Sequence, residues 1–170
     1  MKMKMTSDEI DKWLKDHWIP DYTIRDDGKI NVHSDVQLPN NLYDGDAAGF
    51  VVPAAIQFGS IDGDFRCGQA RLEDKGWLPE HIHGSFDCSL SPTLSLSGIH
   101  KVVKTIESHV YCRRNSTHIL GVLMIPRVRV YIGDTGGPVD TIMNKYINTG
   151  DVISAQDELL EAGYVQQAKL

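Results

Sequence analysis

The sequence predicts an α+β fold, in which a short leucine-rich-repeat-like β-solenoid lies between an N-terminal capping helix and a C-terminal helical hairpin. Three observations predict this class: a seven-residue pattern that recurs in the middle of the chain, short period-two segments around it, and apolar residues at helical intervals near both ends. The chain has 170 residues. This length suits a single domain, residues 1–170, with a hydrophobic core of its own.

The first predicted element is an amphipathic capping helix within residues 1–20. Thr6 and Glu9 have the spacing of a capping box, and apolar residues follow at helical intervals from Ile10. Pro20 lacks a backbone N–H, so we expect the helix to end before it. The helix would cover the first turn of a solenoid, which otherwise exposes its core.

Residues 22–60 are predicted to form a strand and loop lead-in. The Asp-Asp-Gly turn at residues 26–28 precedes Ile30 and Val32, which alternate with polar residues as in a strand or hairpin. Residues 39–51 are rich in Asn, Asp and Gly and have no clear period, which predicts a loop.

The repeat region, residues 61–132, gives the strongest signal. Each unit reads apolar, any residue, small, any residue, apolar, any residue, cysteine. The cysteines are 21 and 24 residues apart, and leucine-rich-repeat units are about 20–29 residues long. The three units are residues 61–67, 82–88 and 106–112.

Alternation predicts which side of each repeat strand is buried. Side chains two apart in a strand point to the same face, so the apolar residue and the cysteine of each unit should point inward together. The predicted core ladder is Phe65, Cys67, Phe86, Cys88, Val110 and Cys112. One such strand cannot bury its apolar side alone, so we expect the units to stack as parallel strands. Three cysteines in a chain without an export signal favour free, buried thiols.

A further strand is predicted at residues 128–132, where apolar residues alternate with Arg129 and Tyr131. If it continues the ladder, we expect Arg129 and Tyr131 to lie beside Tyr111 and Arg113. This would extend the outward side of the repeat strands by one more row.

The end of the chain, residues 134–170, is predicted to form a helical cap. One helix opens at Pro138, a residue that the first helical turn tolerates well, and a second covers residues 151–162. The apolar run at residues 119–125 is expected to be buried, and its sequence is compatible with either a strand or a helix.

The outward residues of the repeat strands are the best candidate for a binding surface. Arg and Tyr are enriched at interface hot spots because they combine large contact area with directional hydrogen bonds. The alternative is a solvated strand face on which arginine stems cover their neighbours. The candidate binding surface is Arg66, Asp87, His109, Tyr111, Arg113, Arg129 and Tyr131.

Metal and enzyme chemistry are the weaker alternatives. His81 and His83 share one side of an extended segment, but the paired Cys/His spacings of zinc sites are absent, so we predict no metal and no cofactor. His83 and Ser85 form one histidine-x-serine element of the kind that two-histidine phosphoesterases carry twice. The loop Gly133–Gly137 precedes a helix but lacks the Lys-Ser/Thr of a phosphate-binding loop. The alternative function is thus a small nucleotide-binding or nucleotide-cleaving protein that uses these histidines and this loop. No catalytic residue is assigned.

Several phrases carry a family resemblance: GSFDCS (84–89), LSLSGIHK (94–101), NKY (144–146), ELLEAGY (158–164) and AKL (168–170). Together they resemble a group of bacteriophage and bacterial proteins with degenerate leucine-rich-like repeats, over about the last two thirds of the chain. The resemblance implies a solenoid fold and a phage-like origin, and it carries over no catalytic residue. Ala70 and Ser91 depart from the pattern, because the repeat usually has Asn there.

The predicted function is that of a non-enzymatic, phage-type interaction module. It would bind a host bacterial protein, such as a defence protein, and inhibit or redirect it. The net charge of −6 disfavours nucleic acid as a partner. No apolar run approaches the roughly 18–20 residues of a membrane helix, and the first residues do not resemble a signal peptide, so we predict a protein of the host cytoplasm without membrane contact. The oligomeric state is left open, with a homodimer as one option.

Overall fold

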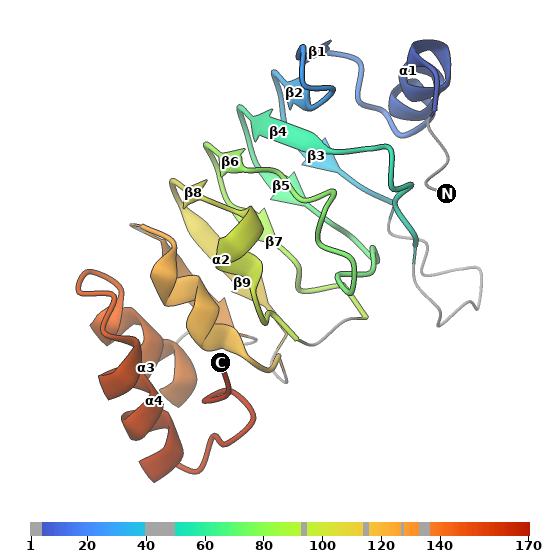
Figure 1. Cartoon of the computed structure of the whole chain (residues 1–170). Coiled ribbons are helices and arrows are strands. Elements are labelled where there is room, and N and C mark those ends of the chain that lie inside the picture. Colours follow the sequence, from blue (N-terminus) through green and yellow to red (C-terminus); the bar gives the residue numbers. More distant parts are fainter. Residues whose placement is uncertain (1–4, 40–49, 93–94, 114–115, 127, 133–136) are drawn as a thin grey trace.

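The computed structural model describes residues 5–39, 50–92, 95–113, 116–126, 128–132 and 137–170. In it, the chain forms a β-solenoid of four turns with helices at its N-terminal and C-terminal ends (Figure 1). The predicted fold class, an α+β solenoid with helical caps, is confirmed. None of the described helices combines the length and the apolar character needed to cross a membrane.

The strands form two sheets. In chain order the elements are α1 (Ser7–Asp16), β1 (Tyr22–Ile24), β2 (Ile30–Val32), β3 (Val36–Gln37), β4 (Phe58–Ile61), β5 (Phe65–Arg66), β6 (His81–Ile82), β7 (Phe86–Asp87), α2 (Ile99–Val102), β8 (Thr105–Ile106), β9 (His109–Cys112), the 3-10 helix η1 (Ile119–Met124), β10 (Arg129–Ile132), α3 (Pro138–Tyr146) and α4 (Val152–Glu161). Sheet A has the order β1-β2-β4-β6-β8, and sheet B has the order β10-β9-β7-β5-β3. Each complete turn contributes one strand to each sheet. Neighbouring strands are parallel except β1 and β2.

Helix α1 begins and ends with local signals. Thr6 and Glu9 form the predicted capping box: the Thr6 backbone N–H donates to the Glu9 carboxylate at 2.7 Å, and the Glu9 N–H donates to Thr6 Oγ1 at 3.3 Å. At the other end, the Ile19 N–H donates to the Leu14 carbonyl at 2.9 Å, and both side chains are buried. One side of the helix therefore packs against the core of the first turn, as is usual for an amphipathic helix.

The solenoid begins earlier than the predicted repeat region. Residues 32–38 have the repeat pattern with Leu38 in the place of the cysteine, and Val36 pairs in parallel with Phe65. The hairpin of β1 and β2 is present, but β2 and β3 also form the first solenoid turn. The replacement of cysteine by leucine and the long segment before Cys67 hide this unit from a comparison based on the cysteines.

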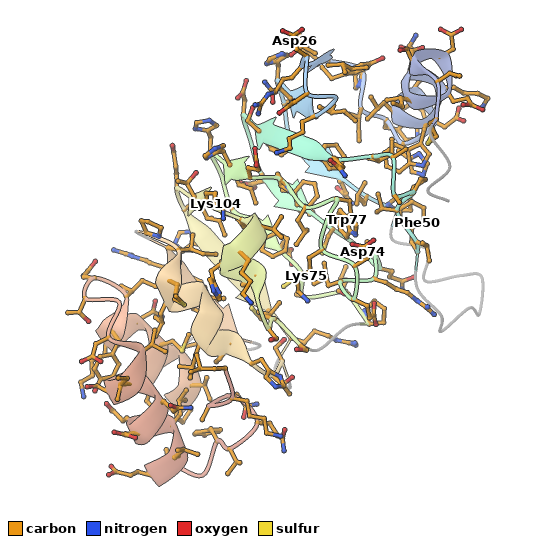
Figure 2. All side chains as sticks on the ribbon, viewed as in Figure 1. Asp26, Phe50, Asp74, Lys75, Trp77 and Lys104 are labelled. Carbon is orange, nitrogen blue, oxygen red and sulfur yellow. The ribbon has the colours of Figure 1, made fainter. Side chains whose placement is uncertain are left out.

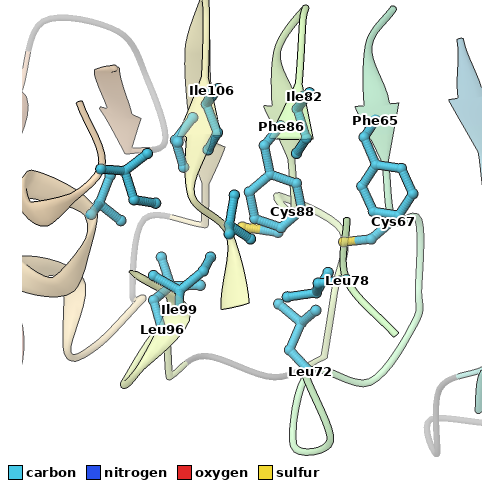
Figure 3. Close-up of a cluster of buried hydrophobic side chains, with 14 of the residues drawn as sticks. Phe65, Cys67, Leu72, Leu78, Ile82, Phe86, Cys88, Leu96, Ile99 and Ile106 are labelled. Carbon is cyan, nitrogen blue, oxygen red and sulfur yellow. The ribbon is translucent and has the colours of Figure 1, made fainter. Parts of the chain in front are cut away.

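The inward side chains form one continuous core. All six residues of the predicted core ladder are buried: Phe65, Cys67, Phe86, Cys88, Val110 and Cys112. The Phe65 ring stacks on Phe86, with ring centroids 6.1 Å apart, and meets Phe58 edge-on at 5.6 Å. Leu72 and Leu78 pack against these rings from the third side of the turn, which is built from loops (Figure 3).

On the third side of the turn, some side chains point into the core and are buried, and others point outward and are exposed. Trp77 is buried, and its ring centroid lies 6.1 Å from that of Phe65, whereas Asp74 on the same loop is exposed (Figure 2). Two strands and one loop per turn therefore enclose the core. An ordinary leucine-rich repeat has one strand per unit, with a helix or 3-10 turn.

The thiols of Cys67 and Cys112 are held in this core as neutral groups. The Cys67 thiol donates to the Asp87 carbonyl and the Cys88 thiol to the Tyr111 carbonyl, at 3.4 and 3.2 Å. Burial raises the pKa of Cys67, and a hydrogen bond with Cys88 together with burial raises the pKa of Cys112. A protonated thiol is neither a nucleophile nor a metal ligand, so Cys67 and Cys112 serve packing.

The corners between the two sheets are joined by aspartate side chains. Asp35 Oδ1 accepts from the Asp64 N–H, and Asp64 Oδ1 accepts from the Ser85 N–H, both at 2.8 Å. A Cβ atom on Gly63 would lie 2.0 Å from the Asp35 oxygen, and one on Gly84 would lie 2.4 Å from the Asp64 oxygen. At Gly63 and Gly84, the small residue of the repeat pattern therefore leaves the space that the aspartate of the preceding turn fills.

The C-terminal end is closed by three helical segments. The apolar run at residues 119–125 folds mainly as η1, which is largely buried and contacts α2, α3 and α4. Helices α3 and α4 form the predicted hairpin at the C-terminal end of the solenoid (Figure 1). Asn144 on α3 bonds to the edge strand: its side-chain oxygen accepts from the Val130 N–H at 3.0 Å, and its nitrogen donates to the Val130 carbonyl at 2.7 Å.

Candidate functional site

The outward side of sheet B gathers most of the predicted binding surface. We call this the sheet B face and define it by Arg66, Asp87, His109, Tyr111, Arg129 and Tyr131. Strand pairing aligns Arg66, Asp87, Tyr111 and Tyr131 in one row across four strands, and His109 and Arg129 lie side by side in a second row. Backbone hydrogen bonds between parallel strands fix both rows, so the side chains stand on a rigid base.

The register of β10 differs from the prediction. Tyr131 lies beside Tyr111, and Arg129 lies beside His109, whereas the prediction placed Arg129 beside Tyr111 and Tyr131 beside Arg113. Val130 aligns with Val110, so the buried row continues without a step. A slip by two residues keeps the same side chains facing outward, and alternation in the sequence therefore does not distinguish the two registers.

Arg113 lies outside these rows. It follows the last residue of β9, Cys112, and is exposed. Its guanidinium Nη1 donates to the Ser91 carbonyl at 3.3 Å, on the loop that follows β7. Arg113 therefore stands at the border between the sheet B face and the third side of the solenoid, rather than within the aromatic row.

Three aromatic rings form a cluster at the C-terminal end of the sheet B face. Tyr111 and Tyr131 stack with their centroids 5.5 Å apart and an interplanar angle of 16°. The His109 ring lies 5.1 Å from that of Tyr131 and 5.9 Å from that of Tyr111. Ser108 Oγ lies 2.6 Å from His109 Nδ1, and this hydrogen bond fixes the imidazole ring. Both tyrosines remain half-buried, so part of each ring is available for contact.

The centre of the sheet B face carries mixed charge. A shallow cavity of about 230 Å³ is lined by Asp64, Arg66, Ser85, Asp87 and Tyr111. Arg66 Nη2 lies 3.5 Å from Asp64 Oδ2, and Asp87 Oδ1 accepts from the Ser89 N–H at 2.9 Å. Two carboxylates and one guanidinium therefore lie within one small depression, which favours a partner that brings its own charged groups.

A larger cavity lies where the sheet B face meets α3. Its volume is about 540 Å³, and it is lined by Arg129, Tyr131, Asn144, Ile147 and Asn148. Three of these residues, from α3 and the segment after it, formed no part of the predicted surface. Their sequence carries no signal for this role, because the cavity depends on how the helical cap packs against β10.

His81 and His83 lie on the outward side of sheet A, away from the tyrosines. His81 Nδ1 lies 3.0 Å from Thr105 Oγ1, and His83 Nδ1 lies 2.9 Å from Glu107 Oε1. Within the described ranges, no group of three or more His, Cys, Asp or Glu side chains is placed to hold a metal ion. Of the loop Gly133–Gly137, residues 133–136 lie outside the described residues, and Gly137 is the N-cap of α3.

Comparisons with known proteins add no assignment. No family model matches the chain, and no curated protein or solved structure matches it. The site offers two stacked tyrosines, an imidazole, two guanidinium groups and two adjacent cavities on a rigid sheet. Such a surface can bind by stacking, hydrogen bonding and charge pairing.

Proposed function

We propose that this protein is a non-enzymatic binding module that contacts a partner protein through the sheet B face. The observation that supports this most is the aromatic cluster of Tyr111, Tyr131 and His109, with Arg129 in the neighbouring row. Tyrosine and arginine are the residues, with tryptophan, that contribute most often to interface hot spots. Here they are concentrated on one face.

The sheet B face is rigid before a partner binds. Stacked rings have lost much of their rotational freedom before binding, so the entropic cost of immobilising Tyr111 and Tyr131 is small. Parallel strands about 4.8 Å apart hold each side chain at a fixed spacing. The aspartate bonds of Asp35 and Asp64 hold the corners between the sheets. A preorganised face of this kind suits recognition of one defined surface.

The resemblance of the sequence to phage proteins adds an expectation about the partner. A host bacterial protein, such as a defence protein, would be inhibited or redirected when its own surface is covered by the sheet B face. Because interfaces of standard size bury about 800 Å² on each side, we expect contact to extend beyond the aromatic cluster toward Arg66 and Asp87.

Capture from a bacterial lysate with matched variants tests the proposal. The face variant is Arg66→Glu with Tyr111→Ala, and the control variant is Lys104→Glu with His81→Ala. Each pair reverses one cation and removes one ring, but Lys104 and His81 are exposed on the other side of the molecule. The tagged full-length proteins are compared by quantitative mass spectrometry after their melting temperatures have been measured.

We expect one host protein to bind the unaltered chain and the control variant equally, and to be lost at least tenfold from the face variant. The reason is that truncation of hot-spot residues typically costs about 2 kcal/mol or more. Equal capture by the two variants would contradict the proposal, and so would a host protein that only the control variant loses.

A further inference from the structure

The cavity between β10 and α3 has one aromatic wall that is free on its cavity side. Tyr131 stacks on Tyr111 through one face of its ring. Tyr111 does not line the cavity of about 540 Å³, whereas Tyr131 does, together with Ile147 of the segment after α3. Because β10 is the last strand of sheet B, the second face of Tyr131 borders this cavity. A flat group inserted there would contact an aromatic ring and an aliphatic side chain.

The backbone of β10 is closed to strand addition at its centre. Asn144 occupies both the N–H and the carbonyl of Val130, at 3.0 and 2.7 Å, in the way that a further strand would. Edge strands protected in this manner do not pair readily with another chain. Recognition at this site must therefore proceed through side chains, and the side chains next to Val130 are Arg129 and Tyr131.

The charge of the cavity selects the ligand. Arg129 is exposed, and within the part of the chain that the structure describes no acidic side chain forms a salt bridge with it. The other lining side chains are neutral. A guanidinium pairs best with a carboxylate or phosphate through two parallel hydrogen bonds. A single cation in a protein of net charge −6 favours the singly charged carboxylate over a phosphate.

We propose that this cavity takes an aromatic side chain of the partner protein, together with the carboxylate of a neighbouring aspartate or glutamate in the same segment. The ring stacks on the free face of Tyr131 and contacts Ile147, while the carboxylate pairs with Arg129. The exposed amide of Asn148 supplies a further hydrogen bond at the rim. This proposal rests on the proposed function and specifies the chemistry of the partner.

The size of the cavity agrees with this occupant. Ligand pockets have volumes of about 300–1,000 Å³, and the cavity of about 540 Å³ lies within that range. Buried aromatic side chains cover about 150–250 Å² each and gain further energy from offset stacking.

A selection from a random peptide library against the immobilised full-length protein tests the proposal. Selected peptides are titrated by calorimetry against the unaltered protein, Arg129→Gln, Tyr131→Ala and Asn148→Phe, with the Lys104→Glu/His81→Ala variant as the control. Asn148→Phe is the sharpest variant, because residue 148 is exposed and a larger side chain there fills the cavity while every residue of the sheet B face keeps its identity.

We expect enriched peptides to contain an aromatic residue within three positions of an aspartate or glutamate, and each cavity variant to weaken binding at least tenfold while the control does not. Peptides without that pair, or peptides that bind Asn148→Phe as well as the unaltered protein, overturn the proposal. Binding of adenosine monophosphate in place of any peptide, with loss in Arg129→Gln, also overturns it.

The lysate capture separates the two proposals. If Asn148→Phe keeps the host partner while Arg66→Glu/Tyr111→Ala loses it, the sheet B face is the binding surface and the cavity proposal is wrong. If both variants keep the partner, the proposed function fails.

Discussion

At the scale of single residues, Gly63 and Gly84 each pack against the aspartate of the preceding turn, Asp35 and Asp64. A Cβ on Gly84 would lie 2.4 Å from Asp64 Oδ1 and 2.7 Å from the Gly63 carbonyl oxygen, and this second atom belongs to the backbone. We expect Gly84→Ala to lower the free energy of unfolding by about 1–3 kcal/mol, the usual range for overpacking. Urea denaturation measures the change.

Gly76 provides the control for that substitution. A Cβ there would meet only the side chain of Asp74, at 3.2 Å, on an exposed loop. Gly76→Ala should change the free energy of unfolding by less than about 0.5 kcal/mol. Similar losses for Gly76→Ala and Gly84→Ala would show that the corner does not depend on this packing.

His100 makes the stability depend on pH. Its Nδ1 is buried and has no hydrogen-bond partner among the described residues. Burial first, and then the charges of Lys101 and Lys104, lower the pKa of His100 below its ordinary value of 6.5. The unfolded chain therefore binds the proton more readily than the folded chain does. Stability from this residue is present above about pH 6.5 and is lost as the pH falls toward the lowered pKa.

The substitution His100→Gln tests this assignment. Glutamine does not titrate, so the fall in melting temperature between about pH 7 and about pH 5 should be smaller in the variant than in the unaltered protein. Thermal melts at both values of pH measure the difference. An equal fall in both proteins would assign the acid sensitivity to other groups.

The sequence predicted the buried core residues more completely than the residues of the candidate site. The cysteine pattern placed Phe65 and Phe86 in the core, because alternation in a strand follows directly from backbone geometry. The same alternation placed Tyr111 and Tyr131 on the outward side. It did not indicate Ile147 or the cavity, because these depend on contacts between segments that no local pattern records.

At the scale of elements, the C-terminal end of α1 contains a strained residue. Trp18 has a φ of 58°, in the left-handed region where glycine is usual after a helix, and its side chain is 91% exposed. The left-handed conformation costs a non-glycine residue about 1–2 kcal/mol. We expect Trp18→Gly to raise the free energy of unfolding by up to about 1 kcal/mol, because the strain is relieved and no buried contact is lost.

Chemical denaturation of Trp18→Gly measures this gain, with Trp18→Ala as the comparison. Alanine removes the ring but keeps the strain, so it should not stabilise the protein. A loss of stability in Trp18→Gly would mean that the exposed indole makes contacts that stabilise the fold.

The hydrogen bonds between α3 and β10 can also be tested by a substitution. In Asn144→Ala the N–H and carbonyl of Val130 lose their partners, and an unsatisfied buried polar group costs about 1–3 kcal/mol. The free edge should also promote association between copies of the chain. We expect a lower melting temperature and a larger species in light scattering, whereas Asn148→Ala should show neither change.

The elements were predictable where their ends carry signals. The capping box fixed the start of α1, and Pro138 marked the first turn of α3. The first solenoid turn was missed because Leu38 replaces the cysteine. The run of residues 119–125 was ambiguous because its apolar residues have no period, and tertiary contacts with the helical cap decide that it forms η1.

At the scale of the whole molecule, the two sheets divide the surface into faces of different chemistry. The sheet B face holds the tyrosines and Arg129, whereas the outward side of sheet A holds pairs such as His83 with Glu107. The sequence predicted a single ladder of strands. It did not predict that each turn bends at a small residue into two sheets, which is what separates His81 from Tyr111.

Site-specific photo-crosslinking in bacterial cells tests the central claim, that the sheet B face is the surface that binds a partner protein. A photoreactive phenylalanine analogue replaces Arg66 in one protein and His81 in another, since both residues are exposed and lie on different sheets. We predict a crosslinked host protein from position 66 and none from position 81. A crosslink of equal or greater yield from position 81 would contradict the account.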